Sequence, residues 1–302
     1  MAIQKEIWTK YIQENLFKDN EFLNYAFNAD QYVLEGKVVH IPNAGSTANV
    51  VKNRTTLPAT VIQRADVDIT YSIDEFTTDP ILIPNADTVE LSYDKLSNVL
   101  SEYESALRQL VAEWMLYNWR AENATSMIRT TGVLVNAHMP GATGTRKKFG
   151  IADVKAARLV LNKQNVSKDD RYLLIDSDMY DQLMDELNIT TYRESSKDLD
   201  LPKGVIGKIF GFYLMERATV STANNSATPV IQLPGASTTT ADNGVAFAWQ
   251  KNTVERALGT VDFFENLGDP TYYGDIYSAL VRMGGRKRRN DQKGVVAIIQ
   301  TP

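Results

Sequence analysis

The sequence predicts an α+β fold in which a long hairpin and a long helix precede a segment of mixed helices and strands. Residues 67–73 alternate apolar and polar side chains, which is the period of a half-buried strand. Residues 96–117 carry apolar side chains at steps of four and three, which is the spacing of one helix face. From residue 150 onward, helix-like and strand-like segments follow one another.

The composition is that of a globular protein large enough to bury a sizeable core. The chain has 302 residues, 43% of them hydrophobic, and a formal net charge of -5. That charge argues against a surface built to hold phosphates. The chain has no cysteine, which excludes disulfides and thiolate chemistry. Because neither a signal peptide nor a membrane span is recognisable, we expect a soluble protein made in a reducing cytoplasm.

The first 30 residues predict an aromatic amphipathic helix. Its apolar residues fit two alternatives, a helix packed on the protein's own core and an arm laid on a neighbouring subunit. The candidates for such a subunit contact are Trp8, Tyr11 and Phe17.

Residues 31–86 predict a long β-hairpin. One strand is "KVVHIP", which ends at Pro42, and the other is the alternating segment 67–73. A two-stranded ribbon is only marginally stable in water, and few partner strands lie nearby in the sequence. We therefore expect another copy of the protein to cover the apolar face. The candidates for that contact are Val67, Ile69, Tyr71 and Ile73.

Residues 87–132 hold the clearest predicted helix. Asp87 and Glu90 resemble a capping pair at its start, and Gly132 is a plausible stop. The apolar seam covers only about three heptads, which favours the long backbone helix of a mixed domain over a solitary coiled coil. The seam consists of Leu96, Leu100, Tyr103, Leu107, Leu110, Trp114 and Tyr117.

The following segment predicts shorter elements. Ser177 and Asp178 mark the start of a helix that follows the strand "RYLLID". Gly204, Gly207 and Gly211 are interpreted as bulge or turn glycines between strands. Residues 221–244, rich in Ser, Thr, Asn and Ala, predict an exposed loop region apart from the short apolar stretch "PVIQLP". Further strands are predicted at 244–249, 261–266, 275–284 and 294–299.

No pattern in the sequence indicates catalysis. The two histidines, His40 and His138, lie far apart, and zinc-ligand spacings, nucleophile elbows and phosphate-binding loops are missing. The carboxylate pairs fit a wet strand face, a polar turn and a helix start, and a calcium or magnesium site built from them is the less favoured alternative. We therefore predict no catalytic residue, no cofactor and no metal ion. The pairs are Asp66 with Asp68, Asp169 with Asp170, and Asp176 with Asp178.

The order of arm, hairpin, long helix, mixed segment and closing strands resembles the major capsid proteins of tailed bacteriophages, with the Hong Kong 97-like fold. The most telling local matches are "GKIFGFYLMERATV", "GVAFAWQKNTVERAL" and "DPTYYGDIYSALVRMGGRKRRNDQKGVVAII". The opening residues also resemble capsid proteins of phages of Bacteroidetes-type hosts. Tyr213 departs from the pattern, because many relatives carry proline there.

The resemblance implies a division of the chain into five regions and a function. It implies an icosahedral head of hexamers and pentamers around double-stranded DNA, with no sequence-specific DNA binding and no enzymatic activity. Scaffolding, portal and decoration proteins are candidate partners, and the virion is the expected location. An encapsulin shell is the alternative, and a cytoplasmic α+β enzyme is less favoured. The regions are an N-terminal arm at 1–30, an E-loop hairpin at 31–86, the spine helix of the P domain at 87–132, an A domain at 133–260 and a return to the P domain at 261–302.

Four consecutive basic residues stand out in this acidic chain. We interpret them as the turn of a terminal P-domain hairpin, with Gly284 and Gly285 permitting positive φ. Their expected partner is an acidic patch on an adjacent subunit, and a nucleic-acid arm is the alternative. The candidate contact residues are Arg286, Lys287, Arg288 and Arg289.

Overall fold

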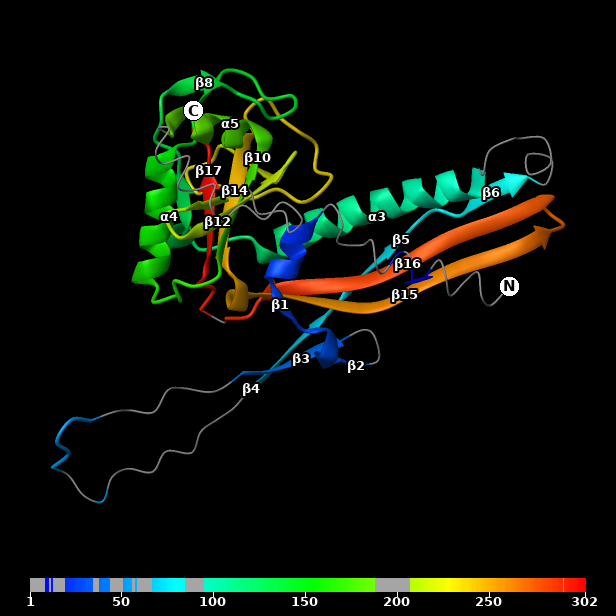
Figure 1. The fold of residues 1–302 in the computed structure, drawn as a ribbon, viewed down its shortest axis with the longest axis horizontal. Helices are drawn as coiled ribbons and strands as arrows, with labels where there is room; N and C mark the ends of the chain where they lie inside the picture. Colours follow the sequence, from blue (N-terminus) through cyan, green and yellow to red (C-terminus); the bar gives the residue numbers. More distant parts are fainter. Residues whose placement is uncertain are drawn as a thin grey trace.

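The protein consists of a compact unit and an elongated unit that meet at a junction from which a hairpin projects (Figure 1). The computed structural model describes residues 9–10, 12, 20–34, 38–43, 51–55, 58, 67–84, 95–187, 207–289 and 291–302. The mixture of helices and sheets confirms the predicted α+β class. Among the helices of these ranges, none is long and apolar enough to cross a membrane.

The compact unit is a seven-stranded sheet with helices α4 (Ile151–Lys163) and α5 (Ser177–Glu186). Its central strands are buried along their whole length, because both faces are covered. In β10, Leu173 and Ile175 face one apolar core, and Tyr172 and Leu174 face the other. The strands are β7 (Met127–Arg129), β10 (Arg171–Asp176), β11 (Gly207–Ile209), β12 (Phe212–Arg217), β13 (Ser221–Ala223), β14 (Asn243–Gln250) and β17 (Val295–Ile299).

Details of the compact unit refine the sequence predictions. The N-cap of α5 is Asp176, whose carboxylate accepts a 2.7 Å hydrogen bond from the Met179 backbone, so the predicted Ser177–Asp178 start lies one residue late. Phe210 and Gly211 both have positive φ in the two-residue turn before β12, which confirms Gly211 as a turn glycine. Gly204 lies outside the described residues. A small hairpin of β8 (Leu134–Asn136) and β9 (Thr145–Lys147) completes the unit.

The prediction of an exposed loop at 221–244 is wrong in part. Strand β13 pairs with β14, and Ala223 bridges to the buried Ile231. The buried Asp242 accepts hydrogen bonds from Thr239 and Gln232, which folds the polar segment back on the sheet. Side-chain hydrogen bonds therefore order the polar part of this segment, beside the buried Ala223 and Ile231.

The elongated unit is a five-stranded sheet with helix α3 (Lys95–Trp119) along one face. Its long strands β15 (Val254–Asp269) and β16 (Gly274–Lys287) pair antiparallel. Strands β5 (Asp74–Thr77) and β6 (Ile81–Pro84) pair with β16, and β1 (Phe27–Asn28) pairs with β15.

Helix α3 confirms the predicted long helix but not its end. It ends at Trp119 rather than near Gly132, and the Trp119 indole donates a 2.9 Å hydrogen bond to the Glu255 carbonyl. Of the predicted seam, Leu107 is buried and Trp114 and Tyr117 pack against the core, whereas Leu110 is 42% exposed. A 3.5-residue seam drifts by about 20° per heptad around a straight helix, which moves Leu110 off the buried face. The buried apolar residues are Leu107, Val111, Ala112, Met115, Leu116 and Trp119.

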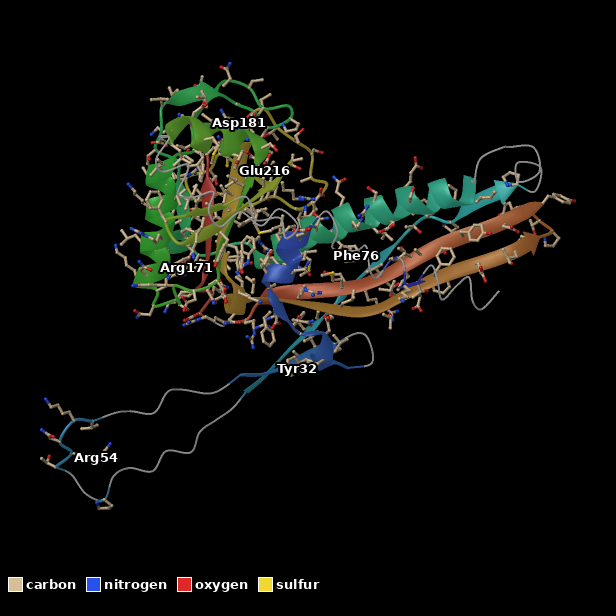
Figure 2. The ribbon with its side chains drawn as sticks, in the orientation of Figure 1. Tyr32, Arg54, Phe76, Arg171, Asp181 and Glu216 are labelled. Carbon is tan, nitrogen blue, oxygen red and sulfur yellow. The ribbon has the colours of Figure 1, made fainter. Side chains whose placement is uncertain are left out.

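The hairpin strands β3 (Val38–Asn43) and β4 (Val67–Ser72) pair antiparallel as predicted, and β2 (Val33–Leu34) adds a third strand. The expectation that the hairpin lacks a local partner is wrong at its base. There Val39 is fully buried in a small cluster with Ala29 and Ala257 of β15. The described residues 51–55, which include Arg54, lie far from both units (Figures 1 and 2).

The N-terminal segment packs on the junction. The 3-10 helix η1 (Glu21–Tyr25) buries Phe22 edge-on against Trp119 and Trp249. The Trp249 indole donates a 3.0 Å hydrogen bond to the Tyr25 carbonyl. For this part of the arm, the core alternative holds. Two further 3-10 turns, η2 (Asp30–Tyr32) and η3 (Ala124–Ser126), flank the junction.

The last two strands do not form a hairpin, contrary to the prediction. Strand β16 belongs to the elongated sheet, whereas β17 lies between β14 and β7 in the compact sheet. The basic run thus connects two sheets. It runs beside the other crossing, the 3-10 turn η6 (Lys251–Thr253), to which the Arg288 backbone donates a 2.9 Å hydrogen bond.

Candidate functional site

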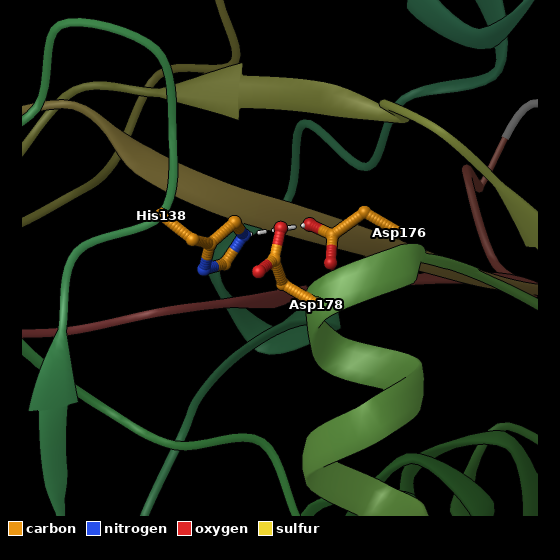
Figure 3. A group of neighbouring side chains, drawn as sticks. All are labelled: His138, Asp176 and Asp178. Atoms are coloured by element: carbon orange, nitrogen blue, oxygen red, sulfur yellow. Dashed lines mark hydrogen bonds and ion pairs between the residues drawn. The ribbon is translucent and has the colours of Figure 1, made fainter.

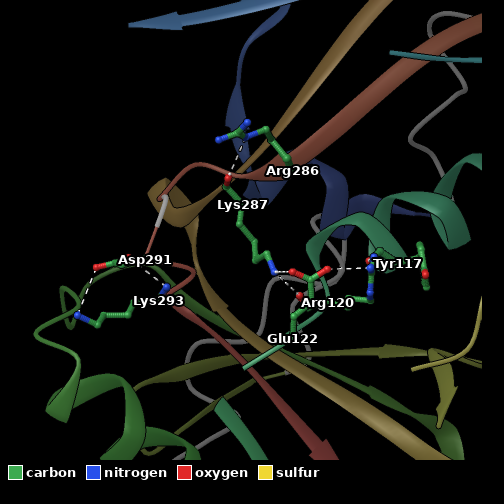
Figure 4. Close-up of polar contacts among 7 residues, drawn as sticks. All are labelled: Tyr117, Arg120, Glu122, Arg286, Lys287, Asp291 and Lys293. Carbon is green, nitrogen blue, oxygen red and sulfur yellow. Dashed lines mark hydrogen bonds and ion pairs between the residues drawn. The ribbon is translucent and has the colours of Figure 1, made fainter. Parts of the chain in front are cut away.

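The basic run lies at the junction of the two units, where the Lys287 side chain contacts residues that directly follow α3 (Figure 4). Its ammonium group lies 2.9 Å from a Glu122 carboxylate oxygen and donates to the Arg120 carbonyl at 3.0 Å. The Lys287 side chain is only 9% exposed. Burial opposes ionisation of Glu122, but the hydrogen bond and charge of Lys287, with Arg120, hold its pKa below the ordinary value.

Arg289 has a local partner instead. Its guanidinium donates two hydrogen bonds, of 2.9 and 2.7 Å, to the Asp291 carboxylate, and Lys293 lies 3.3 Å from the same group. These contacts hold the pKa of Asp291 far below its usual range. Both partners are more than a third exposed, so the pair contributes about 0–1 kcal/mol to stability.

Arg286 and Arg288 flank a buried carboxylate. Glu255 is fully buried, and the Tyr71 hydroxyl is its hydrogen-bonding neighbour. The Arg288 Nε atom lies 3.4 Å from Glu255 Oε2, and its guanidinium stacks 3.7 Å over the Phe27 ring. Arg286 lies 5.6 Å over the Tyr71 ring. Burial raises the pKa of Glu255, and Tyr71 and the two arginines oppose that rise.

Lys287, Arg288 and Arg289 each lie beside a carboxylate of the same chain, and Arg286 donates a 3.1 Å hydrogen bond to the Lys287 carbonyl. The run crosses between two sheets instead of forming the turn of a hairpin. Its expected contact with an acidic patch on an adjacent subunit stays a prediction. The structure also brings together two groups of predicted contact residues, since Tyr71 of the hairpin base faces Arg286 and Glu255. The same burial and charge raise the pKa of the Tyr71 hydroxyl.

The pH dependence of stability should carry the signature of Glu255. Its folded-state pKa lies above the unfolded value, so its contribution is fully present below the unfolded pKa and is lost as pH rises through the folded pKa. We expect Glu255→Gln to remove this dependence. The difference in unfolding free energy between the natural chain and the variant should shift in favour of the natural chain as pH falls from 7 toward 4.5. Urea unfolding at several pH values measures it, and parallel curves would contradict the prediction.

Gly284 and Gly285 allow close packing rather than positive φ, contrary to the sequence interpretation. Neither is among the described positive-φ residues, and both lie inside β16. A Cβ atom on Gly284 would lie 2.6 Å from Ile73 Cγ2, and one on Gly285 would collide with Met115 and the Glu255 carbonyl. Gly294, in contrast, has φ +100° and packs against Thr253.

Only some of the other predicted contact residues lie in the described part of the chain. Trp8, Tyr11 and Phe17 lie outside the described residues, as do the side chains of Val67 and Ile69. Tyr71 and Ile73 pack partly against the small cluster at the hairpin base. Their role in subunit contacts stays a prediction.

An exposed apolar group at the far end of the elongated sheet escaped the sequence interpretation. The strands β15 and β16 meet there in a tight turn around Tyr273, whose φ is +51°. Two aromatic pairs flanking a turn were the available signal. Clustered exposed apolar side chains mark contact surfaces more often than scattered ones do. The group consists of Phe264, Leu267, Tyr272 and Tyr273, which are 37–78% exposed.

A groove of about 190 Å³ lies between the end of α3 and the segments around Thr222 and Pro234. Glu113 is the only acid and Tyr117 the only phenol among its lining residues, which include no histidine, lysine or arginine. Without a base in the lining, these groups form no acid–base pair. The groove gives an enzymatic reading no support.

Comparison with known proteins identifies the architecture first. The capsid of Ralstonia phage GP4 is 12% identical, with a TM-score of 0.64 over 92% of this chain and 87% of that chain. The capsid of cyanophage P-SCSP1u is 16% identical, with a TM-score of 0.63 over 91% and 86%. A Mycobacterium phage Che8 chain is 17% identical, with a TM-score of 0.59 over 92% and 90%. The Hong Kong 97-like fold is thereby confirmed.

The family model described as phage capsid protein matches residues 33–298. The chain therefore belongs to the phage capsid protein family. No curated protein matches it. The prediction of a tailed-phage capsid protein is confirmed, and the encapsulin alternative is not favoured.

Proposed function

We propose that this chain is the structural building block of a phage head, assembling as hexamers and pentamers into a closed icosahedral shell around double-stranded DNA, with no enzymatic activity. The family match over residues 33–298 carries this proposal. The capsid neighbours support a multimer of the protein itself, and the family implies the virion as its location. Synthesis in the bacterial host cytoplasm goes with it.

The shape of the chain supports assembly. The hairpin of β3 and β4 projects from the two units, and a two-stranded ribbon of this kind offers backbone groups that a neighbour can pair with. Val51, at the described end of the hairpin, is 47% exposed. A net charge of -5 also suits a shell that encloses DNA without holding it in place.

We propose region limits that follow sheet membership. The A domain would comprise residues 121–250 and 291–302, because β7, β14 and β17 share one sheet. The P domain would comprise residues 74–119 and 254–289, which form the elongated unit. The residues between β2 and β4 would form the E-loop, and residues 1–30 the arm. Scaffolding, portal and decoration proteins stay candidate partners, and a Bacteroidetes-type host stays a prediction.

Removal of the hairpin should separate folding from assembly. We expect a chain in which residues 45–65 are replaced by a short Gly-Ser linker to stay folded, because the cluster of Val39, Ala29 and Ala257 lies outside the deletion. Shell formation should fall at least tenfold. Circular dichroism and thermal melting measure folding, and electron microscopy with sedimentation measures assembly, in the presence of the neighbouring gene products.

The matched control replaces residues 51–55 by Gly and Ser, so that the hairpin keeps its full length. We expect this variant to assemble more efficiently than the deletion. Normal shells from the deletion variant would refute the role of the hairpin. A strictly monomeric natural chain under all assembly conditions would refute the proposed function itself.

A further inference from the structure

Three side chains with metal-ligand atoms converge where β10 runs into α5 (Figure 3). His138 comes from the loop between β8 and β9, Asp176 ends β10, and Asp178 lies in the first turn of α5. His138 Nε2 lies 2.9 Å from Asp176 Oδ2. One ligand atom of each residue lies within 4.8 Å of the others.

Two of the three side chains are nearly buried, and one of them is held in a fixed orientation. The His138 side chain is 9% exposed and that of Asp176 is 4% exposed, whereas Asp178 is exposed. Asp176 uses Oδ1 to cap α5 at Met179, which turns Oδ2 toward His138. A carboxylate fixed by a second hydrogen bond is the arrangement that orients a ligand at metal sites.

A fourth polar side chain faces the same place and has no partner. Gln300 is fully buried, and neither its amide oxygen nor its amide nitrogen is hydrogen-bonded within the described part of the chain. A Cβ atom on Gly244 would lie 3.0 Å from His138 Nε2 and 3.2 Å from Gln300 Oε1. Both atoms thus lie around one point beside Gly244, where the mobile end of the Met179 side chain, at 2.9 Å, is the nearest other group. Leaving a buried polar group unpaired is unfavourable, and a bound ion would offset that cost.

We propose that His138, Asp176 and Asp178, with the Gln300 amide oxygen, bind one divalent transition-metal ion, for which Zn²⁺ is the best fit. Zinc accepts imidazole nitrogen and carboxylate oxygen at about 2.0–2.2 Å, so tetrahedral ligand atoms lie about 3.4 Å apart. The His138–Asp176 pair must open by roughly half an ångström for this geometry. The imidazole disfavours Mg²⁺ and Ca²⁺, which prefer oxygen ligands alone.

The ion would hold the loop after β8 against the end of the compact sheet at which β10 and β17 finish. Its ligands come from this loop, from the β10–α5 turn and from the residue after β17, so a single ion would join three segments. Because the ion binds the folded chain only, it should raise the melting temperature. This inference concerns the compact unit alone and does not depend on assembly.

The test uses the purified full-length chain after treatment with a chelator. Calorimetric titration with ZnCl₂ should give one ion per chain, and saturating zinc should raise the melting temperature by several degrees. Asp178→Asn should weaken zinc binding at least tenfold while leaving the metal-free melting temperature nearly unchanged, because Asp178 is exposed. His138→Ala should abolish saturable binding. The matched control is Asp181→Asn, an exposed acid on the same helix, which should bind like the natural chain.

Several results would overturn the site. One is the absence of saturable 1:1 binding. Another is a zinc affinity that Asp178→Asn and His138→Ala leave unchanged. A third is Mg²⁺ or Ca²⁺ binding as tightly as Zn²⁺ to the natural chain. Because Asp178→Asn makes no change in the buried part, it keeps the test decisive even if His138→Ala does not fold.

Discussion

Replacing Arg288 by methionine is expected to lower the free energy of unfolding by about 2–4 kcal/mol. The change leaves the buried Glu255 carboxylate without its nearest cation, which now lies at 3.4 Å. Methionine retains a long apolar stem on the Phe27 ring, so the charge is the main loss. Arg288 is 28% exposed, which places the effect below that of a fully buried pair. Urea unfolding followed by tryptophan fluorescence reports it, because Trp119 and Trp249 pack at the junction.

The matched control is Arg289→Met, which removes an equal charge from the same run. Because its pair with Asp291 is exposed, we expect a loss of about 0–1 kcal/mol. Adding Glu255→Gln to Arg288→Met should recover most of the lost stability, since no unpaired charge then stays buried. Equal losses at Arg288 and Arg289 would refute the structural role assigned to Glu255. Replacing Arg286, Arg288 and Arg289 together by glutamate is therefore expected to destabilise the fold itself, because it adds negative charge beside the buried Glu255.

Replacing Gly285 by alanine is expected to destabilise the chain by about 2–3 kcal/mol through overpacking. The added methyl group would collide with Met115 of α3 and with the Glu255 carbonyl of the paired strand. The methionine end can move, but the carbonyl belongs to the sheet backbone. The helix must then separate from the sheet or the two strands must shift. Thermal and urea unfolding measure the loss.

Gly268→Asn provides the control for this variant. Gly268 has φ +67°, a conformation that asparagine tolerates, and no atom lies within 4 Å of an added Cβ. A larger side chain there should change stability by less than about 1 kcal/mol. If both variants lose the same free energy of unfolding, close packing at Gly285 is not the cause of its destabilisation.

Local patterns predicted the elements well because their causes are local. The run "RYLLID" is apolar at its centre because β10 is covered on both faces. The alternation from Thr70 to Ile73 matches an exposed and a half-buried side of the chain. The existence of α3 followed from its repeated apolar spacing. The order of these elements was also enough for the resemblance that the family match confirms.

Long-range partners could not be predicted, because nothing near them in the sequence marks them. Lys287 meets Glu122, 165 residues earlier in the chain, and Glu255 meets Arg288 only because β15 and β16 pair. Glycines that permit close approach look the same in a sequence as glycines that permit a turn, so Gly284 and Gly285 were misinterpreted. His138 likewise joins Asp176 through the fold, across 38 residues.

The two units are joined by three separate stretches of backbone. They are the segment from Trp119 to Met127, the turn at Lys251–Thr253 and the basic run that leads to β17. A single linker would let one unit rotate about one or two residues, but three parallel linkers must all deform together. The Lys287–Glu122 and Arg288–Thr253 contacts brace them against one another. A load applied to the compact unit is thus shared across the junction, which behaves as a stiff coupling rather than as a swivel.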